Sequence, residues 1–287
     1  MFKKILFPVD FSERCRAIAP SVRAFAERFR SEVVLLHVLH MPHAAWGPPE
    51  LGILPDEQLA LNQAAALQSR LDGYLAAEMP GVNIQRIVRI GDPALTIVEF
   101  AHKENAGLIM LPTHGYGPFR RFILGSTAAK VLHDVDCPVW TSAHAEESQA
   151  SSEPRLGVIL CAIDLNPRSV RILRWAASLA EACNSELKIV HAVPAVKVRA
   201  ERETDLQLGG LLETDAVEGI KRMQKEAGIS AEICVEEGRV ETVVRQAAQQ
   251  YKAGLVVLGR TSPGLIGRLR SHDYAIIRES PCPTISI

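Results

Sequence analysis

One segment of the 287-residue chain combines glycines with hydroxyl side chains in a pattern suited to anion binding. Gly115, Gly117 and Gly125 precede Ser126 and Thr127, which begin a predicted helix. Glycine lets backbone N–H groups approach a ligand, and the first turn of a helix offers free N–H groups with partial positive charge. The segment predicts a phosphate site, although a simple turn followed by an N-capping serine would have the same spacing.

A second polar position, Asp10, ends the apolar run of residues 5–9. In open parallel sheets, ligands bind beyond the carboxyl ends of the strands, where the strand order reverses. We therefore expect the end of this run and the glycine segment to meet around one ligand. The predicted site consists of Pro8, Val9, Asp10, Leu111, Pro112, Thr113, His114, Gly115, Gly125, Ser126 and Thr127.

The elements that would position these residues are short Ile/Val/Leu-rich runs alternating with helix-period stretches. Continuous apolar runs indicate strands buried on both faces, and hence a parallel sheet covered by helices on each side. Asp92-Pro93 and Asn166-Pro167 have the residues of an N-cap followed by a first helical proline. In the first half, strands are expected near 4–9, 33–39, 84–90, 108–112 and 138–142, and helices near 12–30, 56–78, 93–105 and 126–135.

The pattern occurs twice. Asp10 and Asp164 end similar apolar runs 154 residues apart, and Cys137-Pro138 and Cys282-Pro283 are 145 residues apart. Ordered self-similarity of this kind indicates a duplicated domain. We expect α/β domains at 1–142 and 155–287, each an open five-stranded parallel sheet of Rossmann-like type. A polar linker at 143–154 would join them.

Composition excludes several classes of function. The chain has 32 Lys and Arg against 33 Asp and Glu, and only 5% aromatic residues, so we expect no nucleic-acid binding. No apolar run approaches the roughly 20 residues of a membrane span. The six cysteines form no CxxC pair, which is typical of reduced thiols in a cytoplasmic protein.

Catalytic and metal-binding patterns are weak. His37, His40, His43 and His114 have no carboxylate or thiol at metal-ligand spacing, and His191 repeats His37, which favours a structural role. The chain has neither a Gly-Lys-Ser/Thr motif nor a Gly-x-Ser-x-Gly elbow. We therefore predict no catalytic residue, no metal site and at most slow ATP hydrolysis.

The whole chain resembles a tandem universal stress protein. The resemblance rests on ILFPVDFSE (5–13), LLHV (35–38), the GDP turn (91–93), THG-x9-GS (113–126) and CPV (137–139). It implies a stress-response protein with a signalling or protective role that binds ATP or AMP. The nucleotide would bind with or without Mg²⁺. The resemblance also implies that Asp10 holds the nucleoside and that Val38 lies against adenine.

The chain departs from that family's glycine pattern at several positions. Pro112 stands at the first glycine of the first copy, which removes an N–H group and adds a ring. In the second copy Gly259 keeps the first glycine, but Ser262 and Arg270 replace the other two before Ser271. We expect one nucleotide site, in the first domain. The alternative is a nucleotide-independent dimerisation or interaction scaffold.

The final strands of the copies, residues 139–142 and 284–287, would each leave an unpaired sheet edge. In the family such strands pair across a dimer, so the resemblance implies an intramolecular pseudo-dimer with antiparallel terminal strands. Association of two chains into a homodimer is also compatible with this arrangement. Two independent domains on a tether are the alternative.

Overall fold

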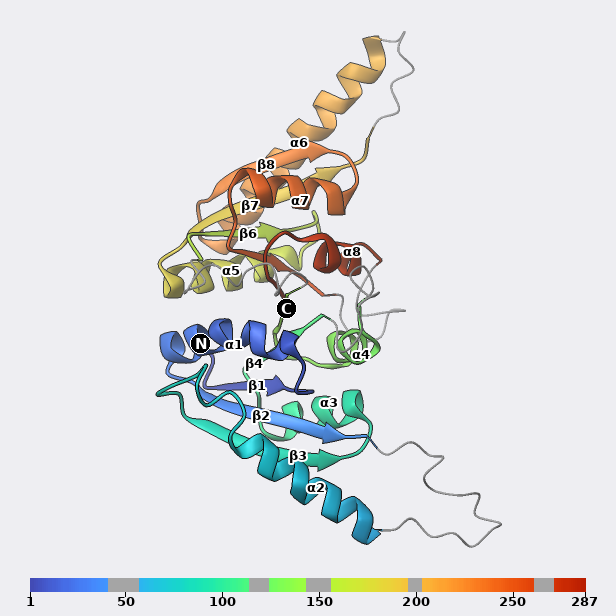
Figure 1. Cartoon of the computed structure of the whole chain (residues 1–287). Helices are drawn as coiled ribbons and strands as arrows, with labels where there is room; N and C mark the ends of the chain where they lie inside the picture. Colours follow the sequence, from blue (N-terminus) through green and yellow to red (C-terminus); the bar gives the residue numbers. More distant parts are fainter. Residues whose placement is uncertain (41–56, 114–123, 143–155, 196–202, 261–270) are drawn as a thin grey trace, which may run out of the picture. The chain divides into compact units, whose positions relative to one another are not determined.

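The computed structural model describes residues 1–40, 57–113, 124–142, 156–195, 203–260 and 271–287 (Figure 1). The described residues up to Val139 form one compact unit, and those from Trp140 onward form another. The predicted linker, 143–154, lies outside the described residues. Over the ranges that are described, no helix is both long enough and apolar enough to cross a membrane.

Within the described residues, each repeat has five strands and four helices in the alternating order that the sequence predicts. The first repeat comprises β1 (Lys4–Pro8), α1 (Glu13–Phe29), β2 (Glu32–Leu39), α2 (Glu57–Asp72), β3 (Ile84–Ile90), α3 (Pro93–Lys103), β4 (Leu108–Pro112), α4 (Ser126–Asp134) and β5 (Val139–Ser142). The second comprises β6 (Val158–Ala162), α5 (Ser169–Cys183), β7 (Glu186–Val193), α6 (Glu203–Ala227), β8 (Glu232–Glu237), α7 (Val240–Gln250), β9 (Leu255–Leu258), α8 (Ser271–Glu279) and β10 (Thr284–Ser286).

The sheet of the first unit has the order β3-β2-β1-β4. Its neighbouring strands are parallel, and Ile5 is in register with Val33 on one side and Leu108 on the other. Because β2 and β3 lie on one side of β1 and β4 on the other, the strand order reverses between β1 and β4. The centre of β1 is fully buried, as its continuous apolar sequence predicts.

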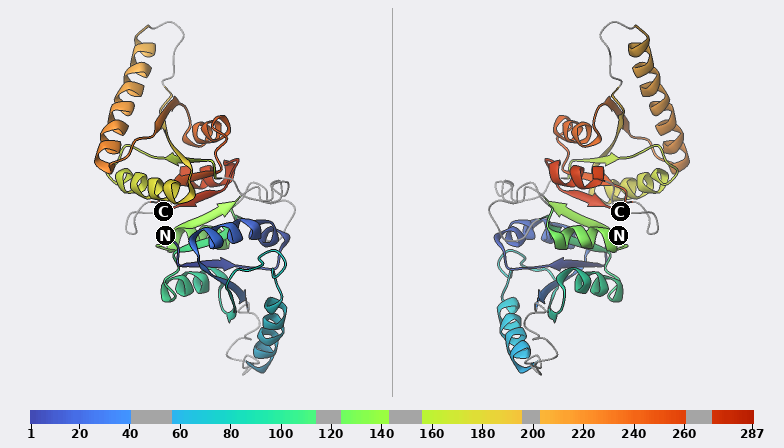
Figure 2. Two further views of the ribbon diagram at one scale, coloured as in Figure 1. Left: turned by 90° about the vertical axis from the view of Figure 1, so that its left-hand side faces the viewer. Right: turned by 90° about the vertical axis from the view of Figure 1, so that its right-hand side faces the viewer.

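The second unit has the sheet order β5-β10-β9-β6-β7-β8. The strands from β10 to β8 are parallel. Helices α5 and α6 pack together, and Figure 2 shows them on one face of this sheet with α7 on the other. The two terminal strands, β5 and β10, are neighbours, and the buried hydroxyls of Thr141 and Thr284 lie 2.8 Å apart. The parallel sheet covered by helices is thus confirmed.

Two of the expected helix boundaries are wrong in detail. Asp92 caps α3 as predicted, because its Oδ1 accepts the Leu95 N–H at 2.9 Å. Asn166, in contrast, accepts the Arg168 N–H at 2.8 Å within a turn, and α5 begins only at Ser169. Helix α2 ends at Asp72 rather than near 78, since a run of turns follows, in which Leu75 has a φ of 56°.

Candidate functional site

A cavity of about 310 Å³ lies at the carboxyl ends of β1, β2 and β4, beside the start of α4. This is the end of the sheet at which the strand order reverses, so the topology places it where parallel sheets bind ligands. Figure 1 shows the elements that surround it in the first unit. The residues around the cavity are Pro8, Val9, Asp10, Cys15, Leu36, His37, Val38, Pro93, Ile97, Leu111, Pro112, Thr113, Gly125, Ser126, Thr127 and Ala128.

Ten of the twelve sequence-predicted site residues therefore line a single cavity. The other two, His114 and Gly115, lie outside the described residues, as does Gly117. The sequence interpretation did not assign Cys15, Leu36, Pro93, Ile97 and Ala128 to the site. His37 was interpreted as structural, yet it also borders the cavity.

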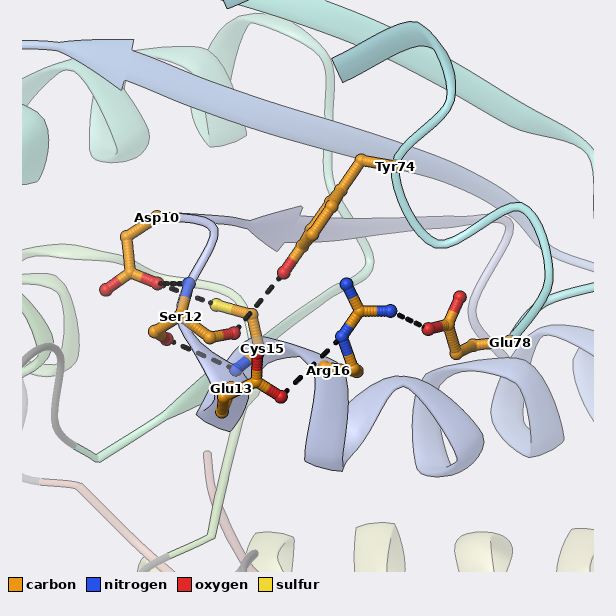
Figure 3. Close-up of polar contacts among 7 residues, drawn as sticks. All are labelled: Asp10, Ser12, Glu13, Cys15, Arg16, Tyr74 and Glu78. Atoms are coloured by element: carbon orange, nitrogen blue, oxygen red, sulfur yellow. Dashed lines mark hydrogen bonds and ion pairs between the residues drawn. The ribbon is translucent and has the colours of Figure 1, made fainter. Parts of the chain in front are cut away.

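The Asp10 carboxylate is held by hydrogen bonds from residues that follow it in the sequence (Figure 3). The Ser12 backbone N–H donates to its Oδ1 at 3.0 Å, and the Cys15 thiol donates to the same oxygen at 3.1 Å. Ser12 is also the N-cap of α1, because its hydroxyl accepts the Cys15 N–H at 3.4 Å. A half-buried carboxylate thus faces the cavity with a defined orientation.

A second layer of contacts joins α1 to the turns after α2. The Tyr74 hydroxyl donates to the Ser12 carbonyl oxygen at 3.3 Å, and Arg16 pairs with Glu78 (Figure 3). The Tyr74 ring packs edge-on against Phe11, which has a φ of 61°. Burial raises the pKa of Tyr74 well above its ordinary value, so the phenol keeps its proton. These contacts hold the turn that carries Asp10 and Ser12.

The start of α4 forms the opposite wall of the cavity. The Gly125 N–H donates to the Thr113 carbonyl oxygen at 2.8 Å, which joins the two described ends of the glycine segment. Gly125 itself is the N-cap, with extended backbone and no side-chain capping bond. The alternative in which Ser126 is an ordinary N-cap is therefore wrong, because Ser126 is the first helical residue and its side chain is exposed.

His37 joins the ends of β1 and β2. Its Nδ1 lies 2.8 Å from the Val9 carbonyl oxygen, and His191 repeats this contact with Ile163 at 2.8 Å. Since a carbonyl oxygen only accepts, Nδ1 carries the proton in both histidines. This agrees with the structural role predicted from the repeat. Across the described ranges, no group of three His, Cys, Asp or Glu side chains could hold a metal ion.

The equivalent region of the second unit has different side chains. Asp164 is retained, and its Oδ1 accepts the Ser169 hydroxyl at 2.8 Å. A Cβ at Gly259 would overlap Ile172 Cδ1, so a larger residue there would displace the end of the Ile172 side chain. Ser262 and Arg270, on which the sequence argument for a degenerate site rests, lie outside the described residues.

A buried carboxylate, Glu241, lies in the first turn of α7 in the second unit, beside the first turn of α8. Its side chain is 3% exposed and its Oε2 lies 3.6 Å from Nδ1 of His272, the second residue of that helix. Arg239 pairs with its other oxygen. The pKa of Glu241 is lowered because its own backbone N–H donates to it and Arg239 lies beside it, which outweighs burial. At the 147-residue offset of the repeat, the first unit has the neutral Ala94.

Comparison with known proteins finds one family. The model of the universal stress protein family matches residues 1–142 and 156–287. Universal stress protein MJ0531 of Methanocaldococcus jannaschii is 31% identical over 139 residues, which are 48% of this chain and 81% of that protein. Universal stress protein Sll1654 of Synechocystis is 29% identical over 48% of this chain and 84% of its own length.

Among solved structures, a universal stress protein from Archaeoglobus fulgidus has the same fold along almost the whole chain. The TM-score is 0.72 at 21% identity, over 99% of this chain and 97% of that one. The functionally unknown protein PA1789 from Pseudomonas aeruginosa has a TM-score of 0.65 at 21% identity, over 100% and 92% of the two chains.

Proposed function

This chain belongs to the universal stress protein family, and from that premise we propose that it is a cytoplasmic stress-response protein whose first domain binds ATP or AMP. The observation that carries the proposal is the convergence of Asp10, Val38 and the start of α4 on one cavity. These residues come from three distant parts of the sequence. Each has a chemistry that one part of a nucleotide requires.

The described side chains fit an adenine nucleoside and its phosphates. Val38 and Leu111 offer apolar surface to a base, and the Asp10 carboxylate accepts hydrogen bonds from ribose hydroxyls. The N-terminus of α4 attracts negative charge, and its N–H groups and the exposed Ser126 hydroxyl donate to phosphate oxygens. A cavity of about 310 Å³ is at the lower end of the range of small-molecule sites.

Two further parts of the proposal concern metal and reaction. Mg²⁺ would arrive with the phosphates of ATP and keep several water ligands, because this cation binds few protein groups directly in phosphate sites. Among the described residues that line the cavity, no side chain is an evident general base beside the start of α4. The protein would therefore sense or sequester nucleotide rather than turn it over rapidly.

The domain limits and self-association are also proposals. We place the domains at 1–142 and 155–287, joined by the linker 143–154, with the terminal strands β5 and β10 holding the two copies as an intramolecular pseudo-dimer. Pairs of chains would form a homodimer through other surfaces. Deleting residues 284–287 is expected to expose the edge of β5 and cause aggregation, which light scattering coupled to gel filtration would detect. A truncated protein that stays monodisperse would remove these strands from the interface.

The direct test of nucleotide binding is the content of the purified protein. Denaturation followed by mass spectrometry is expected to release an adenine nucleotide, and calorimetric titration of nucleotide-free protein with ATP is expected to show binding. Asp10→Ala should abolish that binding, whereas the matched Asp164→Ala should retain it.

A scaffold that binds no nucleotide is the second candidate, and Pro112 is the observation that favours it. Proline at the end of β4 supplies no N–H and places a ring against the cavity. Pro112→Gly distinguishes the two functions. Under the nucleotide-binding proposal it tightens ATP binding, because it restores the family's glycine. Under the scaffold proposal neither the parent protein nor the variant binds ATP.

A further inference from the structure

The thiol of Cys15 lies in an unusual place for a core cysteine. It lies in the first turn of α1, is 1% exposed, and borders the cavity next to the Asp10 carboxylate. Its Sγ–H donates to Asp10 Oδ1 at 3.1 Å, the same oxygen that accepts the Ser12 N–H. Figure 3 shows the other carboxylate oxygen pointing away from both donors. The thiol therefore helps to orient the carboxylate, so that its other oxygen is free to contact a ligand in the cavity.

The internal repeat provides an independent observation of the same arrangement. At the 154-residue offset, Cys15 corresponds to Ser169 and Asp10 to Asp164. The Ser169 hydroxyl lies 2.8 Å from Asp164 Oδ1 and 2.6 Å from the Asp164 carbonyl oxygen. Cysteine and serine share little except shape and a side-chain hydrogen-bond donor. What the two copies have in common is a donor in the first turn of the helix, directed at the aspartate.

The environment of Cys15 keeps its proton in place. Burial, and next the negative charge of Asp10, raise the pKa of the Cys15 thiol to about 12. At neutral pH the group is therefore a thiol and donates, rather than a thiolate that would repel the carboxylate. The Ser12 hydroxyl, in contrast, accepts the Cys15 N–H and caps α1.

We infer that Cys15 is a positioning residue, whose thiol orients the Asp10 carboxylate for ligand binding in the first domain. The inference rests on the proposed function, since Asp10 must contact the nucleotide for its orientation to matter. Cys15 acts through Asp10 and supplies no catalytic group. What this position supplies is a hydrogen-bond donor, for which sulfur is not required.

The test replaces the donor while keeping the packing. With ATP as the probe, Cys15→Ala and Cys15→Val are expected to weaken binding about three- to tenfold, because each removes one hydrogen bond to a charged group. Cys15→Ser, which copies the second repeat, is expected to bind ATP within about twofold of the parent protein. Ser169→Ala, which removes the equivalent bond from Asp164, should leave ATP affinity unchanged. Circular dichroism and melting temperature establish that each variant is folded.

A double-mutant cycle separates positioning from a general effect on the core. The probe is AMP at high concentration. In the Asp10→Asn background, Cys15→Ala should cause no further loss of affinity, because the carboxylate that the Cys15 thiol orients is no longer present. Additive losses would contradict the inference, and so would unchanged affinity in Cys15→Ala or failure of Cys15→Ser to restore binding. If the parent protein binds neither nucleotide, the proposed function itself fails. That result is distinct from parent-like binding by the alanine variant.

Discussion

The imidazole Nδ1 of His37 lies 2.8 Å from the carbonyl oxygen of Val9, so the ends of β1 and β2 are joined at the rim of the cavity. The ring also packs against Phe11, with centroids 4.6 Å apart. Val9 precedes Asp10 directly. The contact therefore fixes Asp10, on which the site depends, relative to the end of β2.

His37→Leu is expected to lower stability by about 1 kcal/mol, because the Val9 carbonyl loses its donor. For a protein of this size the melting temperature should fall by about 2–4 °C. His37→Asn is the matched control, since its Nδ2 occupies nearly the place of the imidazole Nδ1. If the asparagine variant is as unstable as the leucine variant, ring packing and not the hydrogen bond is the source of the stability.

Ser126→Ala should reduce ATP affinity by roughly 1–3 kcal/mol without lowering the melting temperature. The reason is that Gly125, and not Ser126, is the N-cap of α4. Ser12→Ala should behave in the opposite way, because Ser12 does cap α1 and its loss costs about 1 kcal/mol of stability. Calorimetric titration and thermal melts of both variants check the pair. Unchanged affinity in Ser126→Ala would remove this hydroxyl from the site.

The chain should bind one ATP and not two. In the second unit the start of α8, where a phosphate would bind, already has a buried carboxylate beside it, since His272 lies 3.6 Å from Glu241. A negative group beside this helix start repels a phosphate. Titration should give a stoichiometry of one. Two equivalent sites, or loss of binding on mutating the second unit alone, would contradict the asymmetry.

Glu241 should also make the second unit sensitive to acid. Its pKa in the folded protein is lowered by its own backbone N–H and by Arg239, so its contribution to stability is complete at neutral pH and is lost as the pH falls through the lowered pKa. Glu241→Gln should therefore show a smaller fall in melting temperature between about pH 6 and pH 3. Glu236→Gln, an exposed position on β8, should keep the parent profile.

The hydroxyls of Thr141 and Thr284 offer a double-mutant cycle in the second unit. Both residues are buried, at 1% and 0% exposure. Either single change to Val should cost about 1–3 kcal/mol, because it leaves a buried hydroxyl without its partner. Changing both should be nearly neutral. Chemical denaturation measures the four free energies of unfolding, and additive single losses would mean that the hydroxyls do not interact.

Much of the fold could be predicted from the sequence because each strand is a continuous apolar run. The expected strand at 84–90 and the start of α3 at Pro93 match the structure without adjustment. Cap positions were less predictable. Ser126 and Asn166 have capping side chains, but whether such a residue caps depends on which residue is the first with helical dihedral angles. A displacement of one residue at Ser126, and of two at Asn166, reverses the assignment.

The residues that line the cavity could be predicted where they follow the ends of strands. They could not be predicted where helices contribute them. Pro8 to Asp10 and Leu111 to Thr113 are adjacent to strand ends, so the topology alone brings them together. Ile97 and Cys15 reach the cavity only through the packing of α3 and α1 on the sheet. The sequence has one signal for a role of Cys15. Ser169, a hydrogen-bond donor of similar shape, stands at the equivalent position of the second repeat, 154 residues later.

The protonated state of Cys15 has a consequence for survival of the site in an oxidising cell. Oxidants and electrophiles attack the thiolate, and with a pKa of about 12 only about one molecule in 10⁵ has that form at pH 7. The second copy has Ser169, without sulfur, at the equivalent position. We therefore expect hydrogen peroxide to leave the geometry around both aspartates intact, so that ligand recognition persists through the oxidative damage that inactivates proteins with exposed, acidic cysteines.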